Sequence, residues 1–309
     1  MHYSGISAVI CTFNRANLLS QAVSSIAVQD FPAPMTELIV VDNASSDNTI
    51  EVVRDAIHRH PSRAIRYVHE REAGLSAARN RGVKEAKFEI VAFMDDDAMA
   101  DACWLKALWE AYGKKPDARA VGGPIRPWWE APRPRWLADE LLFFVGGIHY
   151  GTGFRRLKQG EFLPGGNFSV SKRAFEEVGL FDNRLGMKGK TIAGAEEIDL
   201  QDRVFREDGA VYYHPSASVK HWVPAWKLKR NYFMRRGFNL ARSNAIKDRL
   251  SHSAPYALRN GAYYAKWILP WCIKAIMPGS PPRRMYSLVR AAIALGYLKA
   301  LPGVILRMP

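Results

Sequence analysis

The sequence predicts an α/β protein built on a mostly parallel sheet. Short apolar runs alternate with amphipathic helical patterns over about the first third of the 309 residues, and the connections between them are short. Such alternation is typical of parallel sheets with right-handed crossovers. The apolar run at residues 90–94 fits a strand that is buried on both faces. With 48% hydrophobic residues, the chain can bury a large core.

The expected strands and helices follow one another along the chain. Apolar runs predict the strands, and apolar residues at helical spacing predict the helices. The expected strands are 6–13, 38–41, 65–70, 90–94 and 120–125. The expected helices are 16–29, 49–58, 74–86, 104–113, a helix capped by Ser171, and 194–208.

Polar side chains gather where three of these strands end. Residues 12–15 follow the first strand, Asp42 ends the second, and Asp95, Asp96 and Asp97 end the strand at 90–94. Ligands of parallel sheets bind at the carboxyl ends of the strands. Three adjacent carboxylates repel one another unless a cation is near, and Mg²⁺ or Mn²⁺ binds carboxylates together with phosphates. A metal–phosphate site is one reading, and a solvated acidic helix cap is the other.

Two common phosphate-binding fingerprints are missing from the sequence. No GxGxxG follows the first strand, and no GxxxxGK[ST] is present. Their absence argues against a dinucleotide-dependent oxidoreductase and against a P-loop NTPase. We therefore expect any phosphate to be held by a metal ion and by cationic side chains.

Four segments together resemble the nucleotide-binding half of the family 2 glycosyltransferases. They occur in the order and rough spacing of that family, and they are VICTFNR (9–15), IVVDNASSDNT (39–49), GLSAARNRG (74–82) and FMDDDA (93–98). The resemblance implies the GT-A fold, which is a Rossmann-like, mostly parallel sheet flanked by helices. It also implies an inverting transfer from a nucleotide-diphosphate sugar, with a UDP-sugar as the first choice, and Mn²⁺ or Mg²⁺ as the cofactor.

The resemblance assigns the nucleotide-binding roles. Asp42 matches the acid that reads the base, and Thr12, Phe13 and Arg15 match the loop around the nucleoside. Arg79 matches a basic residue near the nucleotide. Without the resemblance, Asp42 would be a turn-forming residue and Arg79 a solvated helix arginine.

The acidic run matches the DxD motif of the family. In that family the motif touches the ribose and binds the metal that bridges the diphosphate. Asp95 and Asp97 are the ends of the motif, and Asp96 can share either task because three aspartates leave the register open. His221 lies about where some relatives have a third, histidine ligand, although a lone histidine is more often structural.

The acidic segment GAEEIDLQDRVFRED, at residues 194–208, resembles the motif that carries the catalytic base of the family. Direct displacement needs one carboxylate to deprotonate the acceptor hydroxyl. Alignment places Glu197 at the base. The family usually has Asp there, so Glu196 stays an alternative. Without the other motifs, this stretch would be a surface helix.

Two short segments are candidates for the acceptor side. Trp128 and Trp129 lie in a segment rich in Trp, Pro and Arg, and indole faces stack well on sugar rings. Packing in a core or an interface is the commoner role of a single Trp. Gly165 and Gly166 allow a ligand to approach the backbone closely, and they also fit an ordinary turn.

Positive charge is concentrated at the C-terminal end. The net charge of the chain is +14, and residues 226–309 contain 16 Lys or Arg with Asp248 as their one acid. The expected organisation is a catalytic domain at 1–225, with a donor half (1–120) and an acceptor half (121–225), followed by a basic helical tail at 226–309. Helices are expected in the tail at 227–249, 263–277 and 285–306.

The basic tail predicts an anionic partner. Its apolar runs are interrupted by charges and prolines, which fits amphipathic helices on an anionic membrane surface better than spanning helices. A helix pair that forms a homo-oligomer and an arm that binds nucleic acid are the alternatives, and the long apolar runs argue against nucleic acid. With no secretory signal in the sequence, we expect a cytoplasmic protein that is peripherally attached to the inner face of the cell membrane.

The expected activity is the transfer of a sugar to a glycan or a lipid-linked acceptor during synthesis of a cell-surface polysaccharide or glycolipid. Two other classes share the metal and phosphate chemistry. A nucleotidyltransferase should have a basic Gly-rich loop near its N-terminus, and none is visible. The acidic pair at 196–197 argues against a sugar-nucleotide-binding protein without catalysis.

Overall fold

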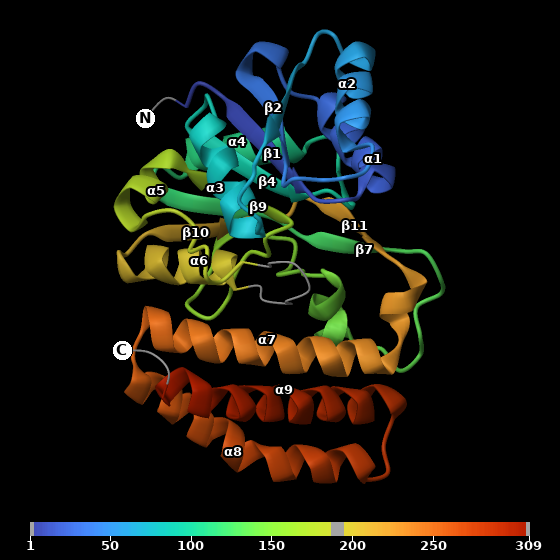
Figure 1. The fold of residues 1–309 in the computed structure, drawn as a ribbon, viewed down its shortest axis with the longest axis vertical. Helices are drawn as coiled ribbons and strands as arrows, with labels where there is room; N and C mark the ends of the chain where they lie inside the picture. The colour runs from blue at the N-terminus through green and yellow to red at the C-terminus, as the bar shows by residue number, and fades with distance from the viewer. Residues whose placement is uncertain (1–2, 187–194, 307–309) are drawn as a thin grey trace. The chain divides into compact units, whose positions relative to one another are not determined.

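The computed structural model describes residues 3–186 and 195–306, and it divides into two compact units (Figure 1). Unit 1 comprises residues 1–126, 146–189 and 196–222. Unit 2 comprises residues 127–145, 190–195 and 223–309, so it contains a segment from the middle of the chain in addition to the basic tail.

Unit 1 is built on a sheet that has eight strands in the described part of the chain, in the order β3-β2-β1-β4-β9-β6-β10-β8. The first four neighbours are parallel, as the sequence predicts, and their register brings the polar strand ends together. Thr12 pairs with Asp42, and Cys11 pairs with Asp95. The strands are β1 (Ile6–Thr12), β2 (Thr36–Asp42), β3 (Ala64–His69), β4 (Ile90–Asp95), β6 (Ala118–Gly122), β8 (Arg155–Arg156), β9 (Asn167–Ser171) and β10 (Ala210–Tyr213).

One central strand was not expected. The sequence predicted the helix after Ser171, whereas β9, which precedes that helix, lies antiparallel between β4 and β6. Asn167 at its start pairs with Met94, so the two glycines before β9 reach the carboxyl end of β4. The side chain of Asn167 is fully buried, and it accepts from the Trp104 indole and donates to the backbone at Pro124 and Ala217.

Helices cover both faces of this sheet, which explains why its inner strands are apolar at nearly every position. Ala8 and Ile10 of β1 point into one core, and Val9 points into the other. Burying a Val or Ile side chain contributes about 1.5–3 kcal/mol, so both faces stabilise the unit. The first core is covered by α1 (Ala16–Ala27), α2 (Thr49–Arg59) and α4 (Trp104–Lys114). The second is covered by α3 (Leu75–Glu85), α5 (Lys172–Val178) and α6 (Glu196–Arg206).

A smaller sheet brings a distant histidine to the acidic run. Its order is β5-β11-β7, with β5 (Ala98–Ala100), β11 (Val219–Val223) and β7 (Ile125–Trp129). The predicted strand at 120–125 is therefore wrong in its bounds, because β6 ends at Gly122 and β7 starts at Ile125. His221 of β11 pairs with Ala98, which directly follows Asp97.

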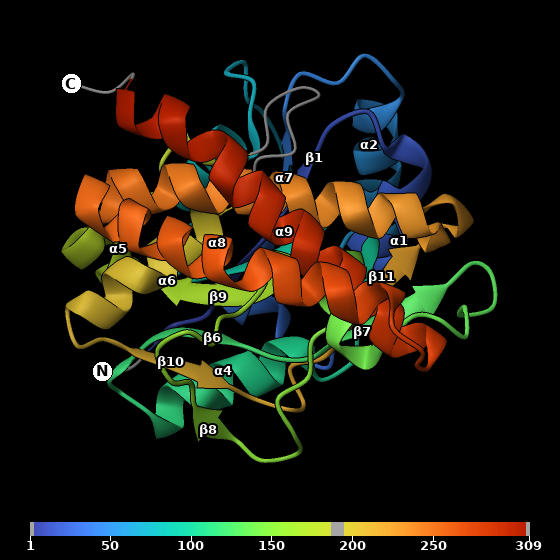
Figure 2. The ribbon, with the colours of Figure 1, turned by 90° about the horizontal axis from the view of Figure 1, so that it is seen from below.

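Unit 2 is helical. Its long helices are α7 (Arg230–Ser251), α8 (Ala254–Ile276) and α9 (Pro281–Leu306), with the short helical turns η2 (Asp139–Val145) and η3 (Ala225–Leu228); a third such turn, η1 (Ala33–Met35), belongs to unit 1. Helix α9 packs against both α7 and α8 (Figures 1 and 2). A Cβ atom at Gly296 would lie 2.1 Å from the Phe238 carbonyl oxygen, so this glycine permits the close approach of α9 to α7. Helix α8 begins well before the predicted start at residue 263.

The single acid of the basic tail joins its helices. Asp248 of α7 is buried and accepts hydrogen bonds from Tyr297 of α9 and from Asn260 of α8, each at 2.8 Å. Its carboxylate therefore links the three long helices inside the unit. Among the described residues, none of the helices has the combination of length and apolar character that crossing a membrane requires.

Candidate active site

The acidic run at the end of β4 is neutralised in part by the loop after β1. Arg15 donates to Asp96 at 2.9 Å and to Asp97 at 2.8 Å, and Thr12 donates to Asp96 at 2.8 Å. Burial raises the pKa of Asp96 to about 6; Arg15 opposes this shift and Asp97 adds to it. The chain thus holds closely spaced carboxylates at low exposure, as the metal–phosphate reading requires and the solvated-cap reading does not.

Asp95, Asp97 and His221 form a cluster that could hold a metal ion. One ligand atom from each lies within 4.8 Å of the others, and Nε2 of His221 is 3.1 Å from Oδ1 of Asp97. Two carboxylates and an imidazole suit a divalent cation such as Mn²⁺. Gly146, at φ +86°, leaves room for the imidazole, because a Cβ atom there would lie 3.1 Å from its Nδ1.

Asp42 and Phe13, which are predicted to contact the nucleoside, lie at the ends of β2 and β1. Asp42 is buried and accepts from the Tyr67 hydroxyl at 2.7 Å and from the Ser45 amide at 2.8 Å. Each carboxylate oxygen has a second lone pair, so a base could still donate to it. Phe13 is 52% exposed, which is unusual for a large apolar side chain and leaves its ring available for stacking.

Arg79 is buried rather than solvated. It donates to Glu196 at 2.6 Å, lies 4.0 Å from Glu197, and its guanidinium stands over the Phe168 and Phe181 rings. Burial alone would lower the pKa of Arg79, but the two glutamates raise it above its ordinary value. The arginine stays charged and joins α3 to the acidic helix α6.

The two glutamates of α6 have different surroundings. Glu196 is 1% exposed and is bound by Arg79. Glu197 is more exposed, and its Oε2 atom is buried without a hydrogen-bond partner among the described residues. This oxygen lies 4.0 Å from Nη1 of Arg79, which is too long for a hydrogen bond, so it can still accept one from an incoming hydroxyl.

The glycine pair before β9 lies against the charged side chains of Arg79 and Asp95. A Cβ atom at Gly165 would be 2.2 Å from Nη2 of Arg79, and one at Gly166 would be 2.4 Å from Oδ2 of Asp95. The sequence predicted close approach to a ligand at these positions. In the structure the close approach is to Arg79 and Asp95, and an acceptor role for the glycines stays a prediction.

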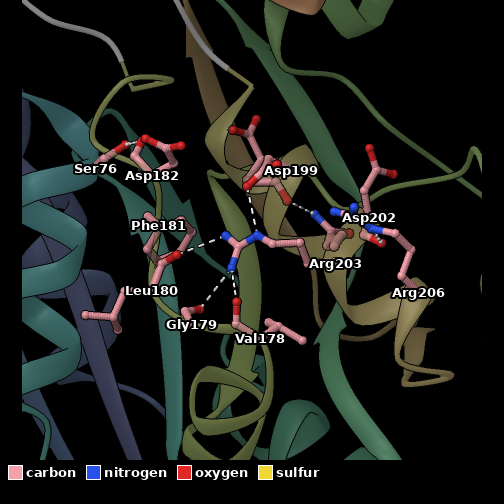
Figure 3. A network of polar contacts seen from close by, with 12 residues as sticks. Ser76, Val178, Gly179, Leu180, Phe181, Asp182, Asp199, Asp202, Arg203 and Arg206 are labelled. Carbon is pink, nitrogen blue, oxygen red and sulfur yellow. Dashed lines mark hydrogen bonds and ion pairs between the residues drawn. The ribbon is translucent and has the colours of Figure 1, made fainter. Parts of the chain in front are cut away.

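Two residues that position α6 were missed by the sequence analysis. The Gln201 amide accepts from the Leu163 N–H at 2.7 Å and donates to the Leu163 carbonyl at 2.8 Å, so it fixes the loop before the glycine pair. Arg203 donates to Asp199 at 2.9 Å, and its guanidinium also binds backbone carbonyls at Val178, Gly179 and Leu180 (Figure 3). The i,i+4 spacing of Asp199 and Arg203 was the one visible signal.

The paired tryptophans of β7 belong to unit 2. Trp128 is exposed, whereas Trp129 is partly buried and packs against the apolar cluster of that unit. Alternation along the strand explains the difference, since neighbouring side chains point to opposite faces. Acceptor binding by these residues stays a prediction.

Comparison with known proteins identifies the class. Residues 7–179 match the family described as Glycosyl transferase family 2. A glucosyl-dolichyl phosphate glucuronosyltransferase of Haloferax volcanii is 29% identical, over 79% of this chain and 78% of that protein. A poly-beta-1,6-N-acetyl-D-glucosamine synthase of Staphylococcus epidermidis is 26% identical, over 71% of this chain and 50% of that protein.

A solved structure shares the fold. The mannosyltransferase PcManGT from Pyrobaculum calidifontis, in complex with GDP-Man and Mn²⁺, has a TM-score of 0.58 and 21% identity, covering 99% of this chain and 74% of that one. The expected GT-A fold is confirmed. The protein therefore belongs to glycosyl transferase family 2, and it is a glycosyltransferase that uses nucleotide-sugar donors.

The Gly166→Ala substitution tests the contact between the glycine pair and Asp95. The added methyl group should displace the Asp95 carboxylate and weaken Mn²⁺ binding about 10- to 100-fold, as is typical when the support of a ligand is disturbed. Gly153→Ala is the control, because no atom lies within 4 Å of its Cβ position. Titration of Mn²⁺ into both variants measures the effect, and equal affinities would refute the role of the glycine.

Proposed function

We propose that the protein is an inverting, metal-dependent glycosyltransferase that transfers a sugar in one direct displacement. The observation that carries this proposal is the difference in hydrogen bonding between the two glutamates on α6. Arg79 binds Glu196, whereas Glu197 keeps a buried oxygen without a hydrogen-bond partner among the described residues. Arg79 also interacts electrostatically with Asp95, so the acidic pair and the metal cluster surround the same arginine.

Glu197 is the proposed base. Its Oε2 atom accepts the proton of the acceptor hydroxyl as that oxygen attacks the anomeric carbon, on the face opposite the leaving diphosphate. Glu196 accepts from Arg79 and holds this arginine in place. The Arg203 and Gln201 contacts fix the helix and the loop around the base.

Asp95, Asp97 and His221 would hold the metal ion. When bound, Mn²⁺ or Mg²⁺ supplies positive charge that stabilises the departing nucleotide diphosphate. Arg15 orients Asp97 from the other side, and Thr12 with Arg15 keeps Asp96 in place. The Mn²⁺ in the similar mannosyltransferase complex supports this assignment.

The proposed donor is a UDP-sugar, with Asp42 accepting from the base and Phe13 stacking beside the nucleoside. Solved relatives contain either GDP-Man or UDP with GalNAc, so related folds accept more than one base. Family membership favours glycosyl transfer over nucleotidyl transfer. The Glu197 oxygen that has no hydrogen-bond partner among the described residues favours an enzyme over a protein that only binds sugar nucleotides.

The proposed acceptor is a glycan or a lipid-linked sugar. The Haloferax relative is named for a glucosyl-dolichyl phosphate acceptor, and the Staphylococcus relative for polysaccharide synthesis. Trp128, Trp129, Gly165 and Gly166 are the proposed acceptor-side residues. A cell-surface polysaccharide or glycolipid is the corresponding product class.

We propose that the basic tail attaches the enzyme peripherally to an anionic membrane, on the inner face of the cell membrane. The outward face of α8 supports this, because it carries exposed Leu269, Ile273 and Ile276. Residues 249–309 contain no Asp or Glu. An apolar helix face beside cations is typical of helices in the lipid headgroup region. A homo-oligomer that buries the same face would bring two strongly basic tails together.

Glu197→Gln should separate transfer from donor binding. It removes the proton acceptor, so kcat should fall at least about 100-fold, while the affinity for the donor changes little. Glu196→Gln, which breaks the ion pair with buried Arg79, should also lower the melting temperature. Transfer assays combined with donor titrations measure both, and full activity of Glu197→Gln would refute the proposed base.

Leu269→Glu should weaken membrane attachment. It replaces an apolar contact with a charge that an anionic surface repels, so vesicle affinity should fall about tenfold or more. Val28→Glu is the matched control, because both side chains are 65% exposed and the charge change is the same. Co-sedimentation with vesicles that contain anionic lipid gives the comparison. If the two variants bind alike, α8 is not the attachment face.

A further inference from the structure

A cavity of about 610 Å³ lies within unit 2, where the turn between α8 and α9 meets the segment around residues 133–140. Its lining combines apolar walls with four cations. The walls include Leu137, Trp271 and Pro282, and the cations are Arg133, Lys274, Arg283 and Arg284.

The four cations of this cavity differ in the hydrogen bonds and ion pairs that they form within the protein. Arg133 pairs with Asp139 at 2.5 Å and donates to the Leu137 carbonyl. Arg284 donates through Nε to the Ala275 carbonyl at 3.1 Å, which leaves its outer nitrogens available. In the described ranges, no ion pair to an acid joins Lys274 or Arg283.

The negative charge on the lining does not balance these cations. Asp139 forms an ion pair with Arg133. Glu140 is then the remaining acid of the lining that could balance Lys274, Arg283 and Arg284. The first turn of α9 contains no acid. Pro281 and Pro282 have no N–H group, so donors to an anion in this cavity come mainly from side chains.

We propose that this cavity binds the phosphate group of an anionic membrane lipid. The guanidinium and ammonium groups are suited to phosphate oxygens, and Arg can donate two parallel hydrogen bonds. Trp271 and Pro282, which are partly exposed, offer apolar surface to the glycerol and the first carbons of the chains. The proposal rests on the attachment of unit 2 to a membrane and adds a defined site to it.

The surroundings of the cavity favour a lipid over a free phosphate ion. Met277 belongs to the lining and is 53% exposed, and neighbouring Ile276 is 78% exposed. A free ion would satisfy the cations and leave these side chains in water, whereas a lipid in a bilayer covers both. A second copy of the chain would place its own basic tail against the same cations.

Two double variants with equal charge test the site. Lys274→Gln with Arg283→Gln removes two cations from the cavity. Arg259→Gln with Lys266→Gln removes two exposed cations from α8 outside the lining. General attraction to an anionic surface would weaken both alike. We expect the cavity variant to lose about tenfold more affinity for vesicles containing phosphatidic acid, because charge-assisted hydrogen bonds are lost as well.

A soluble lipid separates the cavity from membrane attachment. Dihexanoyl phosphatidic acid, below its micelle concentration, should bind the full chain and the control variant. It should bind the cavity variant about tenfold more weakly, and inorganic phosphate should bind all three weakly. Melting curves of the two variants verify that both are folded.

The cavity site and the attachment through α8 would each be contradicted by a different result. Equal binding of the short-chain lipid to both variants would overturn the cavity site, and so would inorganic phosphate binding as tightly as the lipid. Vesicle binding that Leu269→Glu does not weaken would overturn attachment through α8 while leaving the short-chain lipid result in place. Donor binding and transfer to a soluble acceptor test the catalytic proposal separately.

Discussion

The charge balance at the end of β4 constrains the rest of unit 1. Asp96 and Asp97 are both buried, and a buried carboxylate is costly unless cations or donors surround it. Arg15 and Thr12 supply part of that compensation from the end of β1. The parallel register of β1 with β4 is therefore a condition for the acidic run as well as for the core. A divalent cation beside His221 would balance the remaining negative charge, together with that of a bound diphosphate.

A second buried charge ties distant parts of unit 1 together. Arg79 and Glu196 are 117 positions apart, and both side chains are almost fully buried. Breaking such a pair by removing one partner costs about 3–5 kcal/mol, because the other charge is left buried. Gly165 makes the space that this arginine needs. The same arginine lies 4.0 Å from Oε2 of Glu197, so it hydrogen-bonds one glutamate of α6 and forms only a long ion pair with the other.

The convergence of Asp42, Thr12 and the acidic run could be predicted from the sequence, because parallel strands bring their carboxyl ends to one edge of the sheet. The nucleotide-binding roles of these residues came from the family resemblance. Strand β9 was missed because its five residues, NFSVS, are too short and too polar to stand out. The pairing of β9 beside β4 is what places the glycine pair against Arg79 and Asp95.

Other features depend on contacts between segments far apart in the sequence. The difference between Glu196 and Glu197 follows from the position of Arg79 on α3, which no local pattern contains. The clamp of Gln201 on Leu163 is likewise invisible in the helix that carries it. Leu269 and Val28 are equally exposed, and only the exposed Ile273 and Ile276 on the same helix distinguish the surroundings of Leu269.

The most direct test of the central claim is to locate the metal ion. Crystals grown with Mn²⁺ and UDP, measured at a wavelength where manganese scatters anomalously, give its position without reference to the protein model. We expect one strong peak within about 2.3 Å of a carboxylate oxygen of Asp97 and of Nε2 of His221, with a diphosphate oxygen as a further ligand. A peak elsewhere, or UDP bound in full without any peak at this cluster, would contradict it.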